Sequence, residues 1–120
     1  MAGEGLDLNL VEPDEIPLPP EKVRMREILA TPLADGRRVR ISVRMTPFLE
    51  RPTLGLAILA PGGEILSETT VVEADQATLE LTMHLRAEPQ EGRYAVRGEL
   101  SYGGEAPQDV RESHFDLGGS

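Results

Sequence analysis

The arginine side chains are the groups in this sequence with the clearest capacity for chemistry. Eleven of the twelve basic residues are Arg, and a guanidinium group forms paired hydrogen bonds with carboxylates and phosphates. Several recur at alternating positions in two segments, so that their side chains would share one face. They are Arg24, Arg26, Arg38, Arg40 and Arg44. This spacing predicts an anion-binding face. The alternative is an ordinary solvated surface on which acids such as Glu27 and Glu80 pair with the arginines.

The residues that catalysis would need are sparse. Cysteine is absent, and His84 and His114 are the only histidines in the sequence. Ser113, His114 and Asp116 supply the residue types of a hydrolase triad, but adjacent residues of a strand face opposite sides, so Ser113 would not meet His114. We therefore expect no catalytic residue and no cofactor, and we do not expect an enzyme.

Metal ligands are equally sparse. His114 and Asp116 would share a strand face but supply only two ligands. Two pairs of acidic residues in predicted turns also fall short, because Ca²⁺ takes six or more oxygen ligands. These pairs are Glu73 with Asp75 and Glu105 with Asp109. We expect hydrated loops there and no metal site.

Net charge and aromatic content narrow the class of ligand. The 120 residues carry a net charge of −9, which repels nucleic-acid phosphates at long range. Two Tyr and two Phe are the only aromatic residues, so we expect no base-stacking surface and no nucleic-acid partner. A sugar-binding face would also expose Trp or Tyr. The composition favours a non-enzymatic binding or protein-interaction module, with a carbohydrate-binding or other small-ligand-binding domain as the alternative.

Alternation of apolar and polar residues predicts the elements that would position these groups. The clearest case is 39–45, where Val and Ile alternate with Arg and Ser. Strands separated by turn residues, with no convincing helical stretch among them, predict an all-β fold. We expect an antiparallel, immunoglobulin-like sandwich of about seven or eight strands over residues 22–118. The predicted strands after residue 30 are 39–45, 54–60, 65–72, 79–85, 93–102 and 110–117.

Residues 22–30 fit two kinds of structure. Met25, Ile28 and Leu29 have helical spacing after a Pro-Pro-Glu start, whereas Val23 and Met25 alternate with arginines as in a strand. We expect a strand, because an edge strand here would complete the sheet that 39–45 begins.

The stretch Glu91-Gly92-Arg93-Tyr94-Ala95-Val96 resembles the start of strand F in immunoglobulin-like and fibronectin type III-like sandwiches. In those families the tyrosine forms the tyrosine corner, in which its hydroxyl bonds back to the chain just upstream, and Tyr94 would hold that place. Antibody domains have a cysteine where this chain has Val96, and no Trp is present for the usual core site. The resemblance is therefore to disulfide-free, bacterial-type relatives. It implies that the first, second and fifth strands share a sheet, and it says little about activity.

A second candidate surface falls on 54–60 and a strand expected to neighbour it. The outward-facing side chains there are small or apolar: Gly55, Ala57, Leu59 and Ala95. A flat, weakly charged face of this kind would pack against another subunit or a ligand.

Residues 1–21 have the composition of an acidic, Pro-rich arm. They contain six Asp or Glu and no basic residue, whereas the remaining residues have a net charge of only −3. Such a segment buries too little apolar surface to offset the ordering of the chain, so we expect disorder. The arm is either a solubilising tail or a segment that orders on a partner, and one hypothesis is that it binds the arginine face. The expected partner is therefore a protein, including a second copy in a homodimer or the arm itself.

Neither a signal peptide nor a membrane span fits the sequence. Lys22 is the first basic residue, and the longest apolar run, 54–60, has seven residues. We expect a cytoplasmic protein with no membrane contact.

Overall fold

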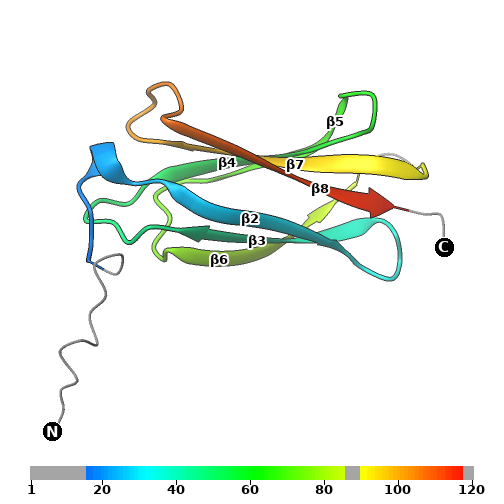
Figure 1. The fold of residues 1–120 in the computed structure, drawn as a ribbon, viewed down its shortest axis with the longest axis horizontal. Coiled ribbons are helices and arrows are strands. Elements are labelled where there is room, and N and C mark those ends of the chain that lie inside the picture. Colours follow the sequence, from blue (N-terminus) through cyan, green and yellow to red (C-terminus); the bar gives the residue numbers. More distant parts are fainter. Residues whose placement is uncertain (1–15, 86–89, 118–120) are drawn as a thin grey trace, which may run out of the picture.

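The computed structural model describes residues 16–85 and 90–117. These residues form a short 3-10 helix, η3 (Pro20–Lys22), and seven strands, which Figure 1 shows as two stacked layers. The predicted all-β antiparallel sandwich is therefore confirmed. The strands are β2 (Met25–Pro32), β3 (Arg38–Met45), β4 (Thr53–Leu59), β5 (Ile65–Val71), β6 (Thr78–His84), β7 (Gly92–Ser101) and β8 (Asp109–Leu117).

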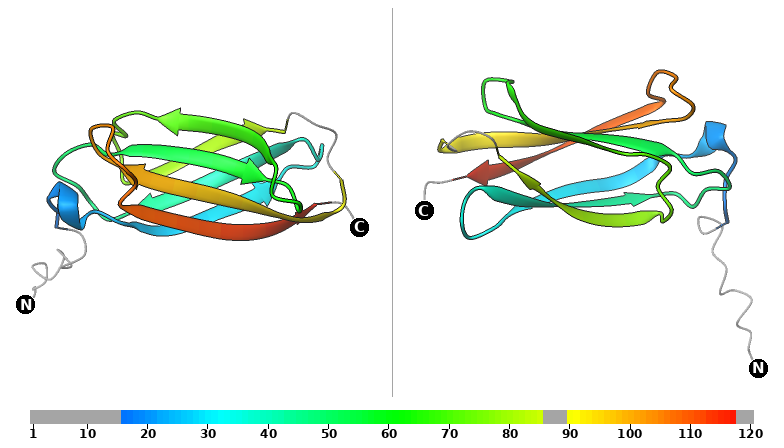
Figure 2. Two further views of the ribbon diagram at one scale, coloured as in Figure 1. Left: turned by 90° about the horizontal axis from the view of Figure 1, so that it is seen from above. Right: turned by 180° about the vertical axis from the view of Figure 1, so that it is seen from behind.

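The strands form two antiparallel sheets. One has three strands in the order β2-β3-β6, and the other has four in the order β5-β4-β7-β8. The left panel of Figure 2 shows the four-stranded sheet from above, with β5 at one edge and β8 at the other. The first, second and fifth strands thus share a sheet, which is the arrangement that the family resemblance implies.

Alternation along each strand explains how the sheets pack. β3 buries Val39, Ile41 and Val43 completely, while the side chains between them face outward. β7 buries Tyr94 and Val96 in the same way. Because one face of each sheet is apolar, the two faces pack together, and removal of this surface from water is the main source of stability.

The start of β2 shows why 22–30 suited both a strand and a helix. Val23 and Met25 are buried, as a strand predicts. A β-bulge between Met25 and Glu27 then adds one residue, so that the next buried side chain is Ile28. Bulges are common on edge strands, where they increase the twist and interrupt further pairing. The three-residue spacing of Met25 and Ile28 therefore comes from the bulge, and the expected strand is confirmed.

Leu18 belongs to the folded part of the chain. Its N–H donates to the carbonyl of Pro47 at 3.1 Å, and its own carbonyl accepts from the N–H of Leu49 at 2.9 Å. Its side chain packs against the core. The defined contacts therefore begin before Glu21, the predicted end of the arm, and residues 1–15 lie outside the described residues, where disorder stays a prediction. Within 16–85 and 90–117, no helix is long and apolar enough to span a membrane.

Candidate functional site

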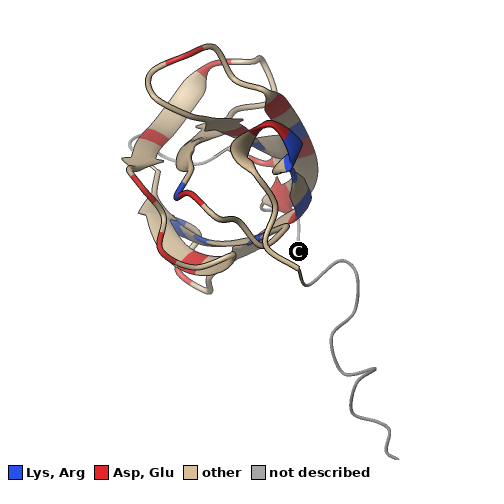
Figure 3. Cartoon of the chain, turned by 90° about the vertical axis from the view of Figure 1, so that its left-hand side faces the viewer, with Lys and Arg blue, Asp and Glu red and all other residues tan. Residues whose placement is uncertain are grey.

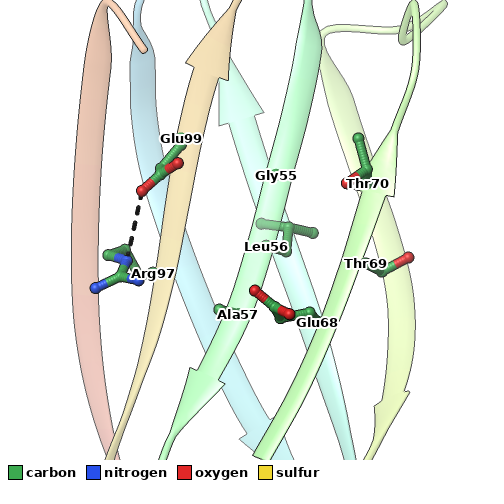
Figure 4. Close-up of a pocket in the computed structure, with 8 residues that line it drawn as sticks. All are labelled: Gly55, Leu56, Ala57, Glu68, Thr69, Thr70, Arg97 and Glu99. Atoms are coloured by element: carbon green, nitrogen blue, oxygen red, sulfur yellow. Dashed lines mark ion pairs between the residues drawn. The ribbon is translucent and has the colours of Figure 1, made fainter. Parts of the chain in front are cut away.

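A hollow of about 310 Å³ lies on the outer face of the four-stranded sheet. Its floor is β4, one of the two inner strands, where Gly55 and Ala57 have little or no side chain. The strands on either side, β5 and β7, carry longer side chains that stand above this floor (Figure 4). We call this feature the hollow and define it by Gly55, Ala57, Glu68, Thr70, Arg97 and Glu99.

The strand register places the walls of the hollow. Ala57 lies between Glu68 on β5 and Arg97 on β7. One residue pair along, Gly55 lies between Thr70 and Glu99 in the same way. Each wall therefore combines a charged side chain with a second polar group, and the two walls flank the small residues Gly55 and Ala57.

The charges on the two walls are balanced differently. On the β7 wall, Nε of Arg97 lies 3.7 Å from Oε2 of Glu99, and Glu112 of β8 is the cross-strand neighbour of Arg97 on the other side. The positive charge of Arg97 is therefore offset by its own neighbours. Glu68, on the β5 wall, has no ion pair within the described part of the chain. The hollow thus has one uncompensated carboxylate, at the edge of the sheet.

The structure places Gly55, Ala57, Leu59 and Ala95 on this same outer face. Leu59 pairs directly with Ala95, so an apolar strip continues along the sheet from the hollow. Ala57 is only 7% exposed, between the two walls. The face is therefore not the flat, weakly charged surface expected from these residues, because the flanking strands bring charged side chains over it.

Sequence reasoning did not find the walls of the hollow. The period-two pattern already placed Arg97 and Glu99 outward, on a strand expected to neighbour 54–60, but it did not give the register that sets them beside Gly55 and Ala57. Glu68 and Thr70 had no signal of their own, since an outward residue on a half-exposed strand is ordinary. These four side chains are brought together by the register of β5 and β7 with β4. That register joins segments far apart in the sequence, and the local pattern does not encode it.

Arginines on the opposite sheet form a row along β3. Arg38, Arg40 and Arg44 are exposed on its outer face. Nε of Arg38 is 2.7 Å from Oδ2 of Asp35, and Nε of Arg44 is 3.6 Å from Oε1 of Glu27. Arg40 has no ion pair with any residue that the structure describes. Figure 3, which looks along the strands, shows acidic residues among the basic ones around both sheets.

The two remaining candidates, Arg24 and Arg26, are not part of this row. Nη1 of Arg24 donates to the carbonyls of Glu21 at 3.0 Å and of Val23 at 2.8 Å, so its guanidinium is engaged by the turn before β2. Arg26 lies at the bulge of β2. Three of the five arginines therefore lie in a row on β3, the Arg24 guanidinium is engaged by its own turn, and anion binding stays a prediction.

Asp35 organises the turn before β3 and engages Arg38. Its Oδ1 accepts hydrogen bonds from the backbone N–H groups of Arg37 at 3.0 Å and Arg38 at 3.1 Å. Its Oδ2 accepts from the Arg38 guanidinium. These bonds, first that from the Arg37 N–H and next that from the Arg38 side chain, lower the pKa of Asp35 from 3.8 to about 2. Arg38 is therefore paired with an ionised carboxylate throughout the neutral range.

Tyr94 is buried at the start of β7 and bonds back to the preceding turn. Its hydroxyl donates to the carbonyl of Gln90 at 2.6 Å and accepts from the N–H of the same residue at 2.8 Å. Its ring stacks on Phe115 with 5.7 Å between centroids. This backward hydrogen bond is the contact that defines a tyrosine corner. The role is structural, because the ring is only 1% exposed.

The remaining polar candidates lie apart or have structural partners. Ser113 pairs with Val96 of the inner face, whereas His114 pairs with Ala95 of the outer face, so their side chains point to opposite sides. Oδ2 of Asp109 accepts the backbone N–H of Met25 at 2.7 Å. Within 16–85 and 90–117, no group of three His, Cys, Asp or Glu side chains is arranged to hold a metal ion.

Comparison with known proteins supports the fold. No protein-family model and no curated protein sequence matches this chain. A glycosyl hydrolase family 2 member from Bacteroides cellulosilyticus DSM 14838 is similar with a TM-score of 0.58 and 14% identity over 79% of this chain. The Bifidobacterium dentium beta-glucuronidase complexed with coumarin-3-O-glucuronide has a TM-score of 0.59 and 15% identity over 79% of this chain.

These matches cover one part of much larger proteins. The chain spans 15% of the Bacteroides protein and 18% of the Bifidobacterium enzyme. The apo beta-glucuronidase from Ruminococcus gnavus gives the same picture, with a TM-score of 0.53, 13% identity and 16% of that chain covered. At this identity the likeness shows the fold alone, a β-sandwich of the kind found as one module within these enzymes.

Proposed function

We propose that this chain is a non-catalytic, immunoglobulin-like interaction module that binds a partner protein through the outer face of its four-stranded sheet. The observation that carries the proposal is the hollow, in which Gly55 and Ala57 leave room between two charged walls. A side chain projecting from a partner fits such a site, because small floor residues let it approach the sheet backbone. The apolar pair Leu59 and Ala95 extends the contact surface beside it.

The composition of this face suits a protein partner. Interfaces combine an apolar centre with a polar rim that fixes orientation. Here the apolar strip and the hollow floor provide the centre, and Glu68, Arg97 and Glu99 provide charges of both signs around it. The similar solved structures support a role as one module among others, since the matched region is a small share of each enzyme.

A carbohydrate is the second candidate ligand, favoured by the polar lining of the hollow. The Thr70 hydroxyl and the Glu68 and Glu99 carboxylates are groups that hydrogen-bond sugar hydroxyls. No aromatic side chain is among the described lining residues, so the stacking contact of many sugar sites is lacking. A partner protein therefore accounts for the surface better than a sugar does.

The proposal is tested by blocking the hollow. Ala57→Arg fills the floor, and Arg40→Glu changes a solvent-facing residue on the other sheet as a matched surface control. Proteins captured from the native cell extract by the immobilised full chain are compared for the wild type and both variants. We expect a partner that Arg40→Glu retains and Ala57→Arg loses. If Ala57→Arg captures the same proteins as the wild type, the hollow does not bind a protein partner.

The carbohydrate candidate has its own test. Glucuronate and methyl glucoside are titrated into the isotopically labelled chain while backbone amide signals are recorded. Saturable shifts at Gly55, Ala57 and Thr70 would favour a sugar ligand, whereas unchanged signals at millimolar sugar would reject it.

A further inference from the structure

The four edge strands of the sandwich differ in how well they are protected from pairing with another strand. β2 has a bulge near its start and Pro32 at its end. β8 carries five ionisable side chains in nine residues. β5 has one charged residue, Glu68, and no proline, and its β-branched residues include Thr69 and Thr70. Charges, prolines and bulges are the devices that discourage edge pairing. β5 has a register shift at its start, between Ile65 and Ser67, but residues 67–71 carry a single charge; β6, with Glu80 as its one carboxylate, is about as weakly protected.

The exposure of apolar side chains also distinguishes β5 from β6, the other edge strand on this side of the sandwich. Ile65, the first residue of β5, is 48% exposed, and Val72, just after its last residue, is 69% exposed. The aliphatic residues Leu79 and Leu81 of β6 are instead half-buried and pack against the core. β5 therefore combines unpaired backbone groups along its outer edge with an exposed apolar side chain at each end.

The chain around β5 is acidic and has no Lys or Arg. Between Pro52 and Leu85 the sequence contains no Lys or Arg. Of the carboxylates in this stretch, Glu68 lies on the outer face of β5 and on the wall of the hollow, without an ion pair among the described residues. Arg97 does not compensate it, because Glu99 and Glu112 lie beside Arg97. The carboxylates in this stretch are Glu64, Glu68, Glu73, Asp75 and Glu80.

We infer that the partner supplies an extended segment with a Lys or Arg that adds as a fifth strand to the edge of β5, with its basic side chain opposite Glu68. Main-chain hydrogen bonds to β5 would give affinity, and the basic side chain, lying toward the hollow, would give specificity. This inference rests on the proposed function and names the chemistry of its partner. Cross-strand pairs of opposite charge favour the arrangement, whereas like charges directly opposite oppose it.

Charge distinguishes this occupant from two others. The chain's own residues 1–21 have a net charge of −6 and would place carboxylates beside Glu68. A second copy paired symmetrically over the full length of β5 would be centred on Glu68 and would place it opposite its own copy. A basic segment meets neither difficulty.

The test uses two short peptides of alternating Thr and Val, blocked at both ends, with a central Lys in one and a central Glu in the other. Each is titrated into the isotopically labelled full chain while backbone amide shifts are followed. We expect the Lys peptide to shift the signals of β5 and to bind about fivefold more tightly than the Glu peptide. Glu68→Lys should invert this preference. Asp116→Lys, a carboxylate-to-Lys change on the opposite edge of the same sheet and outside the hollow, should leave it unchanged.

Three outcomes would overturn the inference. The first is the absence of β5 shifts at millimolar Lys peptide. The second is a preference for Lys that Glu68→Lys and Asp116→Lys change equally. The third is concentration-dependent shifts of β5 without peptide, which would assign the edge to a second copy. A mixed result is also informative. If Ala57→Arg loses a partner that Arg40→Glu retains, but the Lys peptide does not shift β5, the hollow binds a protein and β5 does not accept a basic strand.

Discussion

The carboxylate of Asp109 accepts a hydrogen bond from the backbone N–H of Met25, with 2.7 Å between Oδ2 and N. These are the first residues of β8 and β2, which are edge strands of different sheets. The bond therefore links the two sheets at one side of the sandwich. It also gives a partner to a backbone N–H immediately before the bulge in β2.

Removing this link should destabilise the sandwich. We expect Asp109→Ala to lower the free energy of unfolding by about 1–2 kcal/mol, because the Met25 N–H loses a charged acceptor in a partly buried position. Urea denaturation followed by far-ultraviolet circular dichroism measures this. Asp75→Ala, in an exposed loop, is the control and should change stability by less than about 0.5 kcal/mol. Equal effects of the two substitutions would show that the link contributes nothing.

The two tyrosines allow a matched test of the tyrosine corner. Tyr94→Phe keeps the ring stacked on Phe115 but removes both hydrogen bonds to Gln90. We therefore expect the free energy of unfolding to fall by about 1–3 kcal/mol. Tyr102→Phe removes one exposed hydroxyl bond, to the carbonyl of Glu50, and should cost clearly less. The same denaturation experiment compares them, and a larger loss for Tyr102→Phe would contradict this account of Tyr94.

Gly98 lets the two sheets approach each other. A Cβ at this position would lie 3.0 Å from Cδ1 of Ile28 and 3.0 Å from Sδ of Met25. We therefore expect Gly98→Val to lower stability by about 1–3 kcal/mol through overpacking. At Gly55, on the outer face of β4, the nearest atom to an added Cβ is the carbonyl oxygen of Glu99 at 3.9 Å. Gly55→Val should fold normally, and a loss as large as that of Gly98→Val would disprove the packing argument.

Asp35 should make stability depend on pH in the acid range. Its pKa is lowered from 3.8 to about 2 in the folded chain, so its contribution is present above pH 4 and is lost as the pH falls toward 2. Asp35→Asn keeps an acceptor oxygen but removes the charge. The stability difference between wild type and variant should be constant from pH 5 to 7 and should shrink below pH 4. A difference that does not change between pH 6 and 2.5 would contradict the assignment.

The hypothesis that the acidic arm binds the arginine row is tested by deletion. Removing residues 1–15 takes away five carboxylates but leaves Leu18 and its backbone pairing in place. If the arm binds there, the amide signals of Arg40 and Arg44 should shift at low salt, and the shift should vanish at high salt because the charges are screened. Unchanged signals at low salt would reject the hypothesis.

The fold was predictable because its information is local. Val39, Ile41 and Val43 alternate with polar residues, and that alternation alone requires a half-buried strand. The stretch around Tyr94 also resembles the tyrosine corner of immunoglobulin-like sandwiches, and that resemblance implied a strand order. The bulge at Arg26 was not predictable, since an extra residue in one strand leaves no distinct local pattern.

The candidate site was predicted only in part. Gly55 and Ala57 were recognised as small outward residues, but the hollow depends on Glu68 and Arg97 standing at the same height on the two neighbouring strands. That coincidence is set by register between segments far apart in the sequence. Anion binding by the arginine face stays a prediction, and alternation did not indicate that Arg24 bonds to carbonyls of its own turn.

Hydrogen–deuterium exchange tests the proposed binding face most directly. The full chain is measured alone and in complex with the partner that Ala57→Arg fails to capture. We expect new protection in β4 and β5, at residues 53–59 and 65–71, with β3 unchanged. Protection confined to 38–45, or an exchange pattern that the partner does not alter, would contradict binding through the hollowed face of the four-stranded sheet.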